Sequence, residues 1–248
     1  MPDPDDRSLF LPGVPADLVQ VALAQAGGNE LGSGKFASPE SSAALAANGF
    51  GWFMAANRAA CLPRFPCLSD LDWPVQSVQI ERQMRFPWSG GRHPWLDAAL
   101  ETPSALIGVE SKRYEPFRAA KPATLSEAYD RDCWGEGMAP WCAMRDRLRA
   151  EPRRYRHLDA AQLVKHALGL ATEAGKAGKQ PVLLYLFAEP SRIAAAALAR
   201  HRAEIADFSA RISGARVRFA ACSWREWLAG WDGQAAEHSA QIIDRFQP

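Results

Sequence analysis

A short apolar segment interrupted by two charged residues places the strongest constraint on what this chain can fold into. Residues Ala105–Val109 are apolar and include β-branched side chains, as expected of a buried strand. Glu110 and Lys112 follow, where such a strand should stay apolar. Because they lie two residues apart, a strand would point both side chains to the same face, with Cα atoms roughly 6.6 Å apart.

The segment just before it carries a second acid in an apolar setting. Residues Trp95–Leu100 are apolar except for Asp97, and the turn residues of Glu101–Ser104 could close a hairpin. In that hairpin Asp97 would lie beside Glu110 and near Lys112. Two buried carboxylates and a lysine are costly unless they bind something, and a divalent cation with a positioned water is the economical explanation. On the residues alone, a solvated strand face stays open as the alternative.

The order Asp97…Glu110-Ser111-Lys112 resembles the motif of the PD-(D/E)XK nuclease superfamily. The proline that usually precedes the aspartate is replaced by Leu96. Three further stretches are similar to those of a group of bacterial nuclease-like proteins, namely Ser41–Phe50, Leu158–His166 and Leu183–Pro190. The resemblance implies a restriction-endonuclease-like α/β/α core, in which helices flank a mixed central sheet.

The resemblance also implies a set of catalytic roles. Asp97, Glu110 and the backbone carbonyl of Ser111 would hold Mg²⁺ or Mn²⁺, which favour hard oxygen ligands. Lys112 would orient the attacking water or help to deprotonate it. The implied activity is Mg²⁺-dependent hydrolysis of phosphodiester bonds in nucleic acid, with DNA as the expected substrate of an endonuclease.

Four further residues are candidates for the same site, each with a structural alternative. Glu40 falls in the first turn of a predicted helix, where the helix dipole alone explains an acid. Glu81 lies on an alternating segment, residues 75–86, whose period does not decide between site and solvent. Gln162 and His166 lie one helical turn apart, and RecB-type members of the superfamily place a Gln and a Tyr at this spacing. A lone His on an amphipathic helix is nevertheless more often structural.

The rest of the chain alternates between predicted helices and strands, which favours a layered α/β sheet with mixed strand directions. Helices are expected at residues 16–25, 38–54, 124–132, 159–174, 191–213, 224–231 and 235–246. Strands are expected at residues 75–86, in the hairpin, and at residues 180–188 and 216–223. Residues 1–37, with a mobile loop at 27–35, are expected to form an N-terminal extension, and residues 38–248 a single nuclease-like domain.

Composition limits the choice of partners. The chain has 248 residues, of which 48% are hydrophobic, enough for one sizeable core. Its formal net charge is +1, so a nuclease would need its basic residues concentrated on one face. Positive charge is densest in residues 140–157, where a phosphate-binding surface and a solvated helix face are equally good interpretations. The candidate nucleic-acid contacts there are Arg145, Arg149, Arg153 and Arg154.

The five cysteines have irregular spacings and form no C-x-x-C pair, so a zinc site is not favoured. Reduced thiols in the cytoplasm are the simplest interpretation. No apolar run is long enough to span a bilayer, and no membrane partner is expected. The sequence does not decide between a monomer and a homodimer. Two other functions stay open: a catalytically silent nuclease-fold protein that binds nucleic acid or a protein partner, and a metal hydrolase acting on small phosphoesters.

Overall fold

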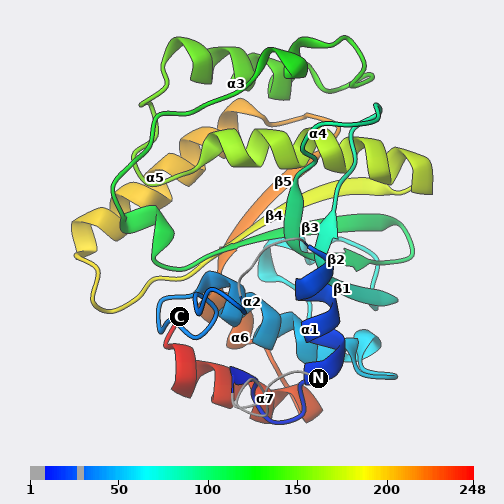
Figure 1. The fold of residues 1–248 in the computed structure, drawn as a ribbon, viewed down its shortest axis with the longest axis vertical. Coiled ribbons are helices and arrows are strands. Elements are labelled where there is room, and N and C mark those ends of the chain that lie inside the picture. Colours follow the sequence, from blue (N-terminus) through cyan, green and yellow to red (C-terminus); the bar gives the residue numbers. More distant parts are fainter. Residues whose placement is uncertain (1–8, 27–30) are drawn as a thin grey trace.

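The computed structural model describes residues 9–26 and 31–248, and its centre is a five-stranded mixed sheet (Figure 1). The strands lie side by side in chain order as β1 (Ser77–Gln83), β2 (Trp95–Glu101), β3 (Ala105–Lys112), β4 (Gln180–Phe187) and β5 (Arg218–Ser223). The α-helices are α1 (Ala16–Gln25), α2 (Ser42–Gly51), α3 (Ala139–Ala150), α4 (Ala160–Ala177), α5 (Ala195–Arg211), α6 (Trp224–Leu228) and α7 (Gly233–Phe246). Of the predicted mobile loop, residues 27–30 lie outside the described residues.

The first three strands form an antiparallel meander, and its last two strands are the predicted hairpin. Ala98 of β2 pairs with Val109 of β3. The turn between them is closed by the N–H of Thr102, which donates to the carbonyl oxygen of Ala105 at 2.9 Å, and by the N–H of Ala105, which donates to the Thr102 hydroxyl at 3.0 Å. β4 and β5 then run parallel to β3, because α4 and α5 carry the chain back along the sheet before each of them.

Helices cover both faces of the sheet, so the fold is an α/β/α arrangement of the restriction-endonuclease-like kind. Helices α1, α2, α6 and α7 lie on one face, and α3, α4 and α5 on the other (Figure 1). Alternate side chains of β3 serve the two layers: Ile107 and Val109 join the core beside α2, and Leu106 joins the core beside α4. Glu110 and Lys112 continue the Leu106 row and therefore face α4. Within the described ranges, no helix combines the length and apolarity needed to cross a membrane.

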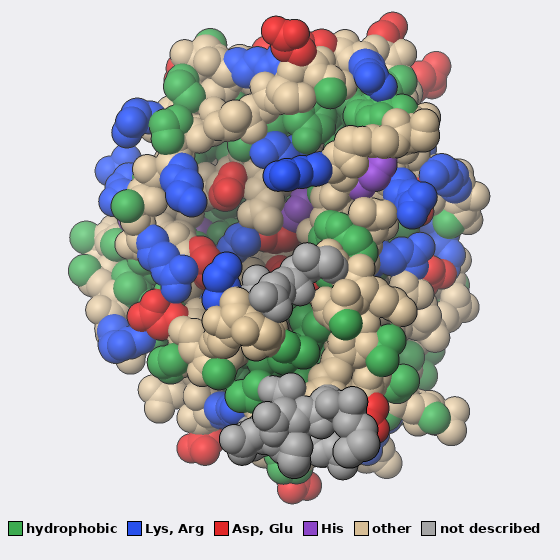
Figure 2. Space-filling view, in the orientation of Figure 1, with side chains coloured by type: hydrophobic (Ala, Val, Ile, Leu, Met, Phe, Trp, Pro, Cys, Tyr) green, Lys and Arg blue, Asp and Glu red, His purple; other side chains and the backbone are tan. Residues whose placement is uncertain are grey.

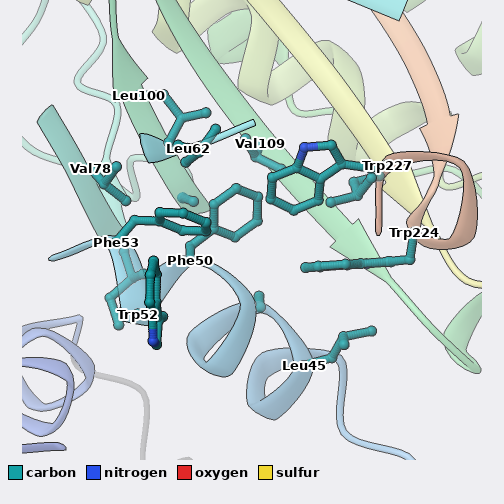
Figure 3. Packing of buried hydrophobic residues seen from close by; sticks show 14 of the residues in the cluster. Leu45, Phe50, Trp52, Phe53, Leu62, Val78, Leu100, Val109, Trp224 and Trp227 are labelled. Atoms are coloured by element: carbon teal, nitrogen blue, oxygen red, sulfur yellow. The ribbon is translucent and has the colours of Figure 1, made fainter. Parts of the chain in front are cut away.

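A cluster of aromatic side chains fixes α2 against the sheet (Figure 3). The Phe50 ring stacks on Trp227 with centroids 5.1 Å apart and meets the edge of Trp224 at 5.7 Å. A Cβ on Gly49 would lie only 2.5 Å from the Trp224 ring, so this close approach requires glycine. The buried Asn48 amide accepts a backbone N–H from the segment that precedes α1, at 2.6 Å. Of the Asn-Gly pair that interrupts the apolar helix, Asn48 therefore anchors the segment before α1, and Gly49 leaves space for the Trp224 ring.

The start of α2 corrects one prediction. The helix predicted from residue 38 begins at Ser42, because the side chain of Ser41 caps it by accepting the N–H of Ala44 at 3.0 Å. Ser38 instead accepts the N–H of Glu40 at 3.3 Å, within a turn. The two serines have similar capping potential in the sequence, so the sequence alone does not fix the first residue of the helix.

The helix predicted at residues 124–132 is also wrong. The structure has a single 3₁₀ turn there, Glu127–Asp130. Its cap is Ser126, whose hydroxyl accepts the N–H of Ala128 at 3.1 Å, and Thr124 does not cap it. The other predicted helices and strands are present, with ends that differ by a few residues.

Candidate active site

Neighbouring strands place charged and polar residues in one row across the sheet. The β2–β3 register ends at the pair Ala98–Val109, and Asp97 and Glu110 are the next residues of the two strands beyond it. On its other side, Glu110 pairs with Tyr185 of β4. The hairpin thus brings the two predicted acids together near the end of β3.

Glu110 is the centre of a buried cluster of charges. Only 2% of its side chain is exposed, and the Lys112 ammonium lies 2.5 Å from its Oε1 atom. Nδ1 of His166, which is 3% exposed, lies 3.1 Å from the other oxygen, Oε2. Burial alone would raise the pKa of Glu110, but Lys112 and His166 hold the pKa down to about 2. The carboxylate is therefore ionised at neutral pH and contacted from two sides.

Lys112 connects this cluster to the surface. Its side chain is 17% exposed and lines a cavity at the end of β3. Burial would lower the pKa of Lys112, but the charges of Glu110 and Asp97 raise it above its ordinary value. The ammonium is consequently a fixed positive charge beside the two acids.

Asp97 is held by the backbone of the neighbouring strand. The N–H of Ser111 donates to Oδ2 of Asp97 at 2.6 Å. The Ser111 side chain lies in the opposite layer, where its hydroxyl accepts the indole N–H of Trp224 at 3.1 Å. Burial and then the negative charge of Glu110 raise the pKa of Asp97 well above its usual range. A cation between the two acids would remove this repulsion.

Glu81 of β1 belongs to the same row of residues and has an unusual backbone conformation. Its neighbours on both sides pair with β2, so the register sets Glu81 opposite Asp97. Its φ angle is 50°, in the left-handed region that non-glycine residues rarely adopt. The negative charge of Glu81 adds to the forces that raise the pKa of Asp97. The structure therefore sets Glu81 close enough to act electrostatically on the site, a point that strand alternation left open.

Helix α4 supplies the second wall of the site. The helix starts after Asp159, whose side chain accepts the N–H of Gln162 at 2.9 Å. His166 contacts Glu110 one turn further on, while Gln162 lines a cavity of about 480 Å³ that Lys112 also lines. Figure 2 shows a hollow in the middle of one face, with acidic and histidine side chains inside it and Lys and Arg side chains around it. Both predicted residues of α4 therefore lie at this end of β3.

Glu115 is an acid at the site that the sequence reasoning missed. It lines the same cavity as Lys112, and its charge contributes to the raised pKa of Lys112. Its carboxylate accepts the hydroxyl of Ser42 at 2.5 Å and the N–H of Arg113 at 2.9 Å. Glu115 begins a 3₁₀ turn, Glu115–Phe117, so the period of two that links Glu110 to Lys112 does not extend to it.

A family described as restriction endonuclease associating with ARP matches residues 17–247, nearly the whole chain. The chain belongs to this family. No curated protein and no solved structure matches it. Membership agrees with the mixed sheet flanked by helices, and it identifies the chain as a restriction-endonuclease-like protein.

The donors of this restriction-endonuclease-like site suit a hard divalent cation. They are the carboxylates of Asp97 and Glu110, with the backbone carbonyl of Ser111 beside them on β3. Oε1 of Glu110 forms an ion pair with Lys112 at 2.5 Å, and a carboxylate oxygen has a second lone pair that could contact a cation. In residues 9–26 and 31–248, no group of three or more His, Cys, Asp or Glu side chains is arranged as a ligand set. Backbone, water and substrate would complete the shell, as they often do for Mg²⁺.

Glu40, in contrast, lies outside this cluster. It forms surface ion pairs with Arg118 at 3.1 Å and with Arg192 at 3.4 Å. None of the contacts of the described residues joins it to Asp97 or Glu110. Its predicted place in the first turn of a helix is also wrong, because α2 starts after it.

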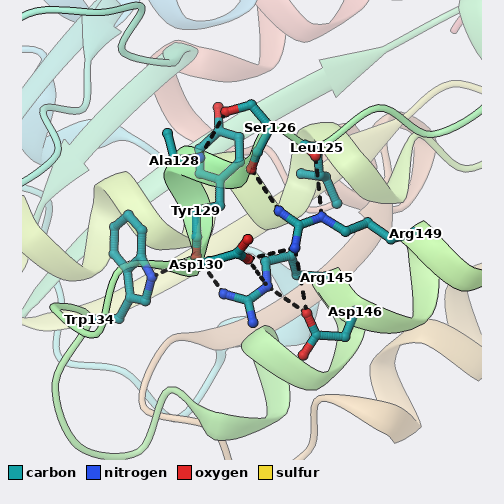
Figure 4. A network of polar contacts seen from close by, with 9 residues as sticks. All are labelled: Leu125, Ser126, Ala128, Tyr129, Asp130, Trp134, Arg145, Asp146 and Arg149. Atoms are coloured by element: carbon teal, nitrogen blue, oxygen red, sulfur yellow. Dashed lines mark hydrogen bonds and ion pairs between the residues drawn. The ribbon is translucent and has the colours of Figure 1, made fainter.

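The predicted basic segment is largely occupied by structural contacts. Arg145 and Arg149 both pair with Asp130, at 3.4 and 2.5 Å, and Arg149 also donates to two backbone carbonyl groups (Figure 4). Arg154 pairs with two nearby carboxylates, and Arg153 is exposed. These contacts fix the loop before α3 against that helix, on the side of α4 away from the sheet (Figure 1). A contact of the four arginines with nucleic acid stays a prediction.

Proposed function

We propose that this chain is a metal-dependent nuclease of the PD-(D/E)XK type, which hydrolyses phosphodiester bonds in DNA with Mg²⁺ or Mn²⁺. One observation carries the proposal. Asp97, Glu110 and Lys112, on two paired strands, converge with the Lys112 ammonium 2.5 Å from Glu110 and the Asp97 carboxylate bound by the N–H of Ser111. The match to a restriction-endonuclease family supports nucleic acid as the substrate.

Each residue of this group has a distinct part in the proposed reaction. Asp97 and Glu110 would hold the metal ion, with the carbonyl of Ser111. When bound, such an ion supplies Lewis-acid stabilisation of the phosphate and lowers the pKa of a bound water. The protonated Lys112 is placed to donate to the attacking water or to a phosphate oxygen, where negative charge develops. His166 contacts Glu110 from α4 and would keep that carboxylate oriented.

The family description adds an association with ARP to the restriction endonuclease. We extend the proposal accordingly: this chain acts as a nuclease in association with ARP.

Cleavage assays with matched variants test the nuclease proposal. The full-length protein is incubated with plasmid, linear duplex and single-stranded DNA, and with RNA, in Mg²⁺, Mn²⁺ or EDTA. Cleavage of DNA is expected only with metal, and Asp97→Asn is expected to reduce it by at least about a hundredfold, because it removes a metal ligand. Asp244→Asn is the control, since Asp244 is an exposed acid on α7.

Two outcomes would contradict the proposal. Undiminished cleavage by Asp97→Asn would remove Asp97 from the site. Binding of DNA by the wild type without cleavage in either metal would favour the other interpretation, a nuclease-fold protein that binds without cutting.

A further inference from the structure

A cavity of about 480 Å³ is lined by Lys112, the lysine whose ammonium pairs with Glu110. Glu115 also lines it, as do Gln162 and Lys165 of α4. Most of the remaining lining comes from two loop segments, residues 116–124 and 152–158. A group bound in this cavity would therefore be in contact with the same lysine that neighbours Glu110.

Positive charge predominates along the lining of this cavity. The lining has five cationic side chains and two acidic ones: Lys112, Arg118, Lys121, Arg156 and Lys165 against Glu115 and Asp159. This excess stands out because the formal net charge of the whole chain is only +1. Lys165 is half-buried and forms no ion pair among the described residues, so its ammonium is available to an anion.

The loop walls are held in place by several hydrogen bonds. The buried carboxylate of Glu204, from α5, accepts the backbone N–H groups of Arg156, His157 and Leu158 at 2.9, 2.6 and 3.1 Å. Nδ1 of His157 lies 2.8 Å from the carbonyl oxygen of Pro116, which joins the two loop segments. The cavity is thus a defined part of the fold, with walls tied to α5 and to each other.

The size and chemistry of the cavity fit one nucleotide. Its volume is at the lower end of ordinary ligand pockets, about 300–1,000 Å³, and is too small for paired strands. Apolar lining from Leu148, Pro116 and Pro152 suits a base, while the cationic rim suits its phosphates. Enzymes that act on a nucleotide in such a pocket require it to be unpaired or flipped out of the duplex.

We infer that this cavity binds one unpaired nucleotide of DNA next to the phosphate that is cut. This inference rests on the proposed nuclease function. Lys165 contacts the phosphate of that nucleotide, and Arg156 contacts the strand at the rim. The preferred substrate is accordingly single-stranded DNA, or DNA with a flap or a frayed end, in preference to an intact duplex.

Binding in EDTA tests this inference without cleavage. Fluorescence anisotropy of the full-length protein is measured with a single strand, with the fully paired duplex, and with a duplex that carries an unpaired end of the same sequence. Because a paired base must first be opened, the two unpaired DNAs are expected to bind at least about tenfold more tightly than the duplex. Lys165→Glu is expected to abolish this preference, whereas Lys176→Glu, on the exposed far end of the same helix, is expected to keep it.

The outcomes separate the inference from the function on which it rests. Equal affinity for paired and unpaired DNA, or an unchanged preference in Lys165→Glu, would overturn the nucleotide cavity. Should Lys165→Glu unfold at a lower temperature than the wild type, Lys165→Gln removes the charge more conservatively and decides the point. If unpaired DNA is preferred but nothing is cut in Mg²⁺, the nuclease proposal fails and the cavity assignment stands. If paired DNA is cut as fast as unpaired DNA and bound as tightly, the cavity assignment fails and the nuclease proposal stands.

Discussion

Asp97→Asn is expected to make the protein more stable in the absence of metal, while it removes cleavage. Asp97 and Glu110 lie on paired strands, and burial and then the negative charge of Glu110 raise the pKa of Asp97 well above its usual range. Two negative charges about 5 Å apart would repel by roughly 3 kcal/mol at an effective dielectric constant near 20. Lys112, 2.5 Å from Glu110, offsets part of this repulsion. A net gain of about 1–2 kcal/mol is therefore expected from the substitution.

Asparagine suits this test because its side-chain oxygen can still accept the N–H of Ser111. For a chain of this size, the expected gain raises the midpoint of thermal unfolding by roughly 2–8 °C, which differential scanning fluorimetry in EDTA can measure. Glu110→Gln is the contrasting variant: it breaks the buried pair with Lys112 and should destabilise the fold by about 3–5 kcal/mol. Mg²⁺ should stabilise the wild type and not Asp97→Asn. An Asp97→Asn protein that melts at or below the wild-type temperature in EDTA would refute the account of two opposed carboxylates.

Three further predictions concern the scaffold. Burial lowers the pKa of His201 from 6.5 to about 4, so His201 binds a proton in the unfolded chain before it does in the folded one as the pH falls. Roughly 3 kcal/mol of folding stability should therefore be lost between pH 6.5 and pH 4. Urea unfolding of His201→Gln should show a smaller loss over the same pH range. Gly49→Ala should destabilise by about 1–3 kcal/mol because its Cβ would clash with the Trp224 ring, whereas Gly230→Ala has room and should change the thermal midpoint little. Glu204→Gln should cost about 1–3 kcal/mol in chemical denaturation, since an amide has one acceptor oxygen for three backbone N–H groups; an unchanged midpoint would show that this carboxylate is dispensable.

The part of the site that lies on adjacent strands could be predicted from the sequence. The period of two in β3 sets Glu110 and Lys112 on one face, and the short turn after β2 fixes which residue stands beside Glu110. Both signals are local, because a hairpin joins residues that are close in the chain. The same reasoning supports the α4 residues, since one helical turn separates Gln162 from His166.

The features that depend on long-range contacts could not be predicted. The left-handed conformation of Glu81 has no counterpart in the hydrophobic pattern, because an alternating segment has the same pattern with or without such a residue. The pairing of Arg145 and Arg149 with Asp130, which lies in a loop before α3, also has no counterpart in the sequence pattern. Ser38 and Ser41 have similar capping potential in the sequence, whereas in the structure Ser41 is the cap, so Glu40 precedes α2.

We propose above all that two paired strands hold a divalent cation between Asp97 and Glu110. A crystal of the full-length protein soaked in Mn²⁺, with anomalous diffraction recorded at a wavelength where manganese scatters, tests it most directly. The account predicts an anomalous peak between the carboxylates of Asp97 and Glu110 within ligand distance of both, and its loss in an Asp97→Asn crystal. A map with no peak between these two residues, or with manganese bound only elsewhere, would contradict the account.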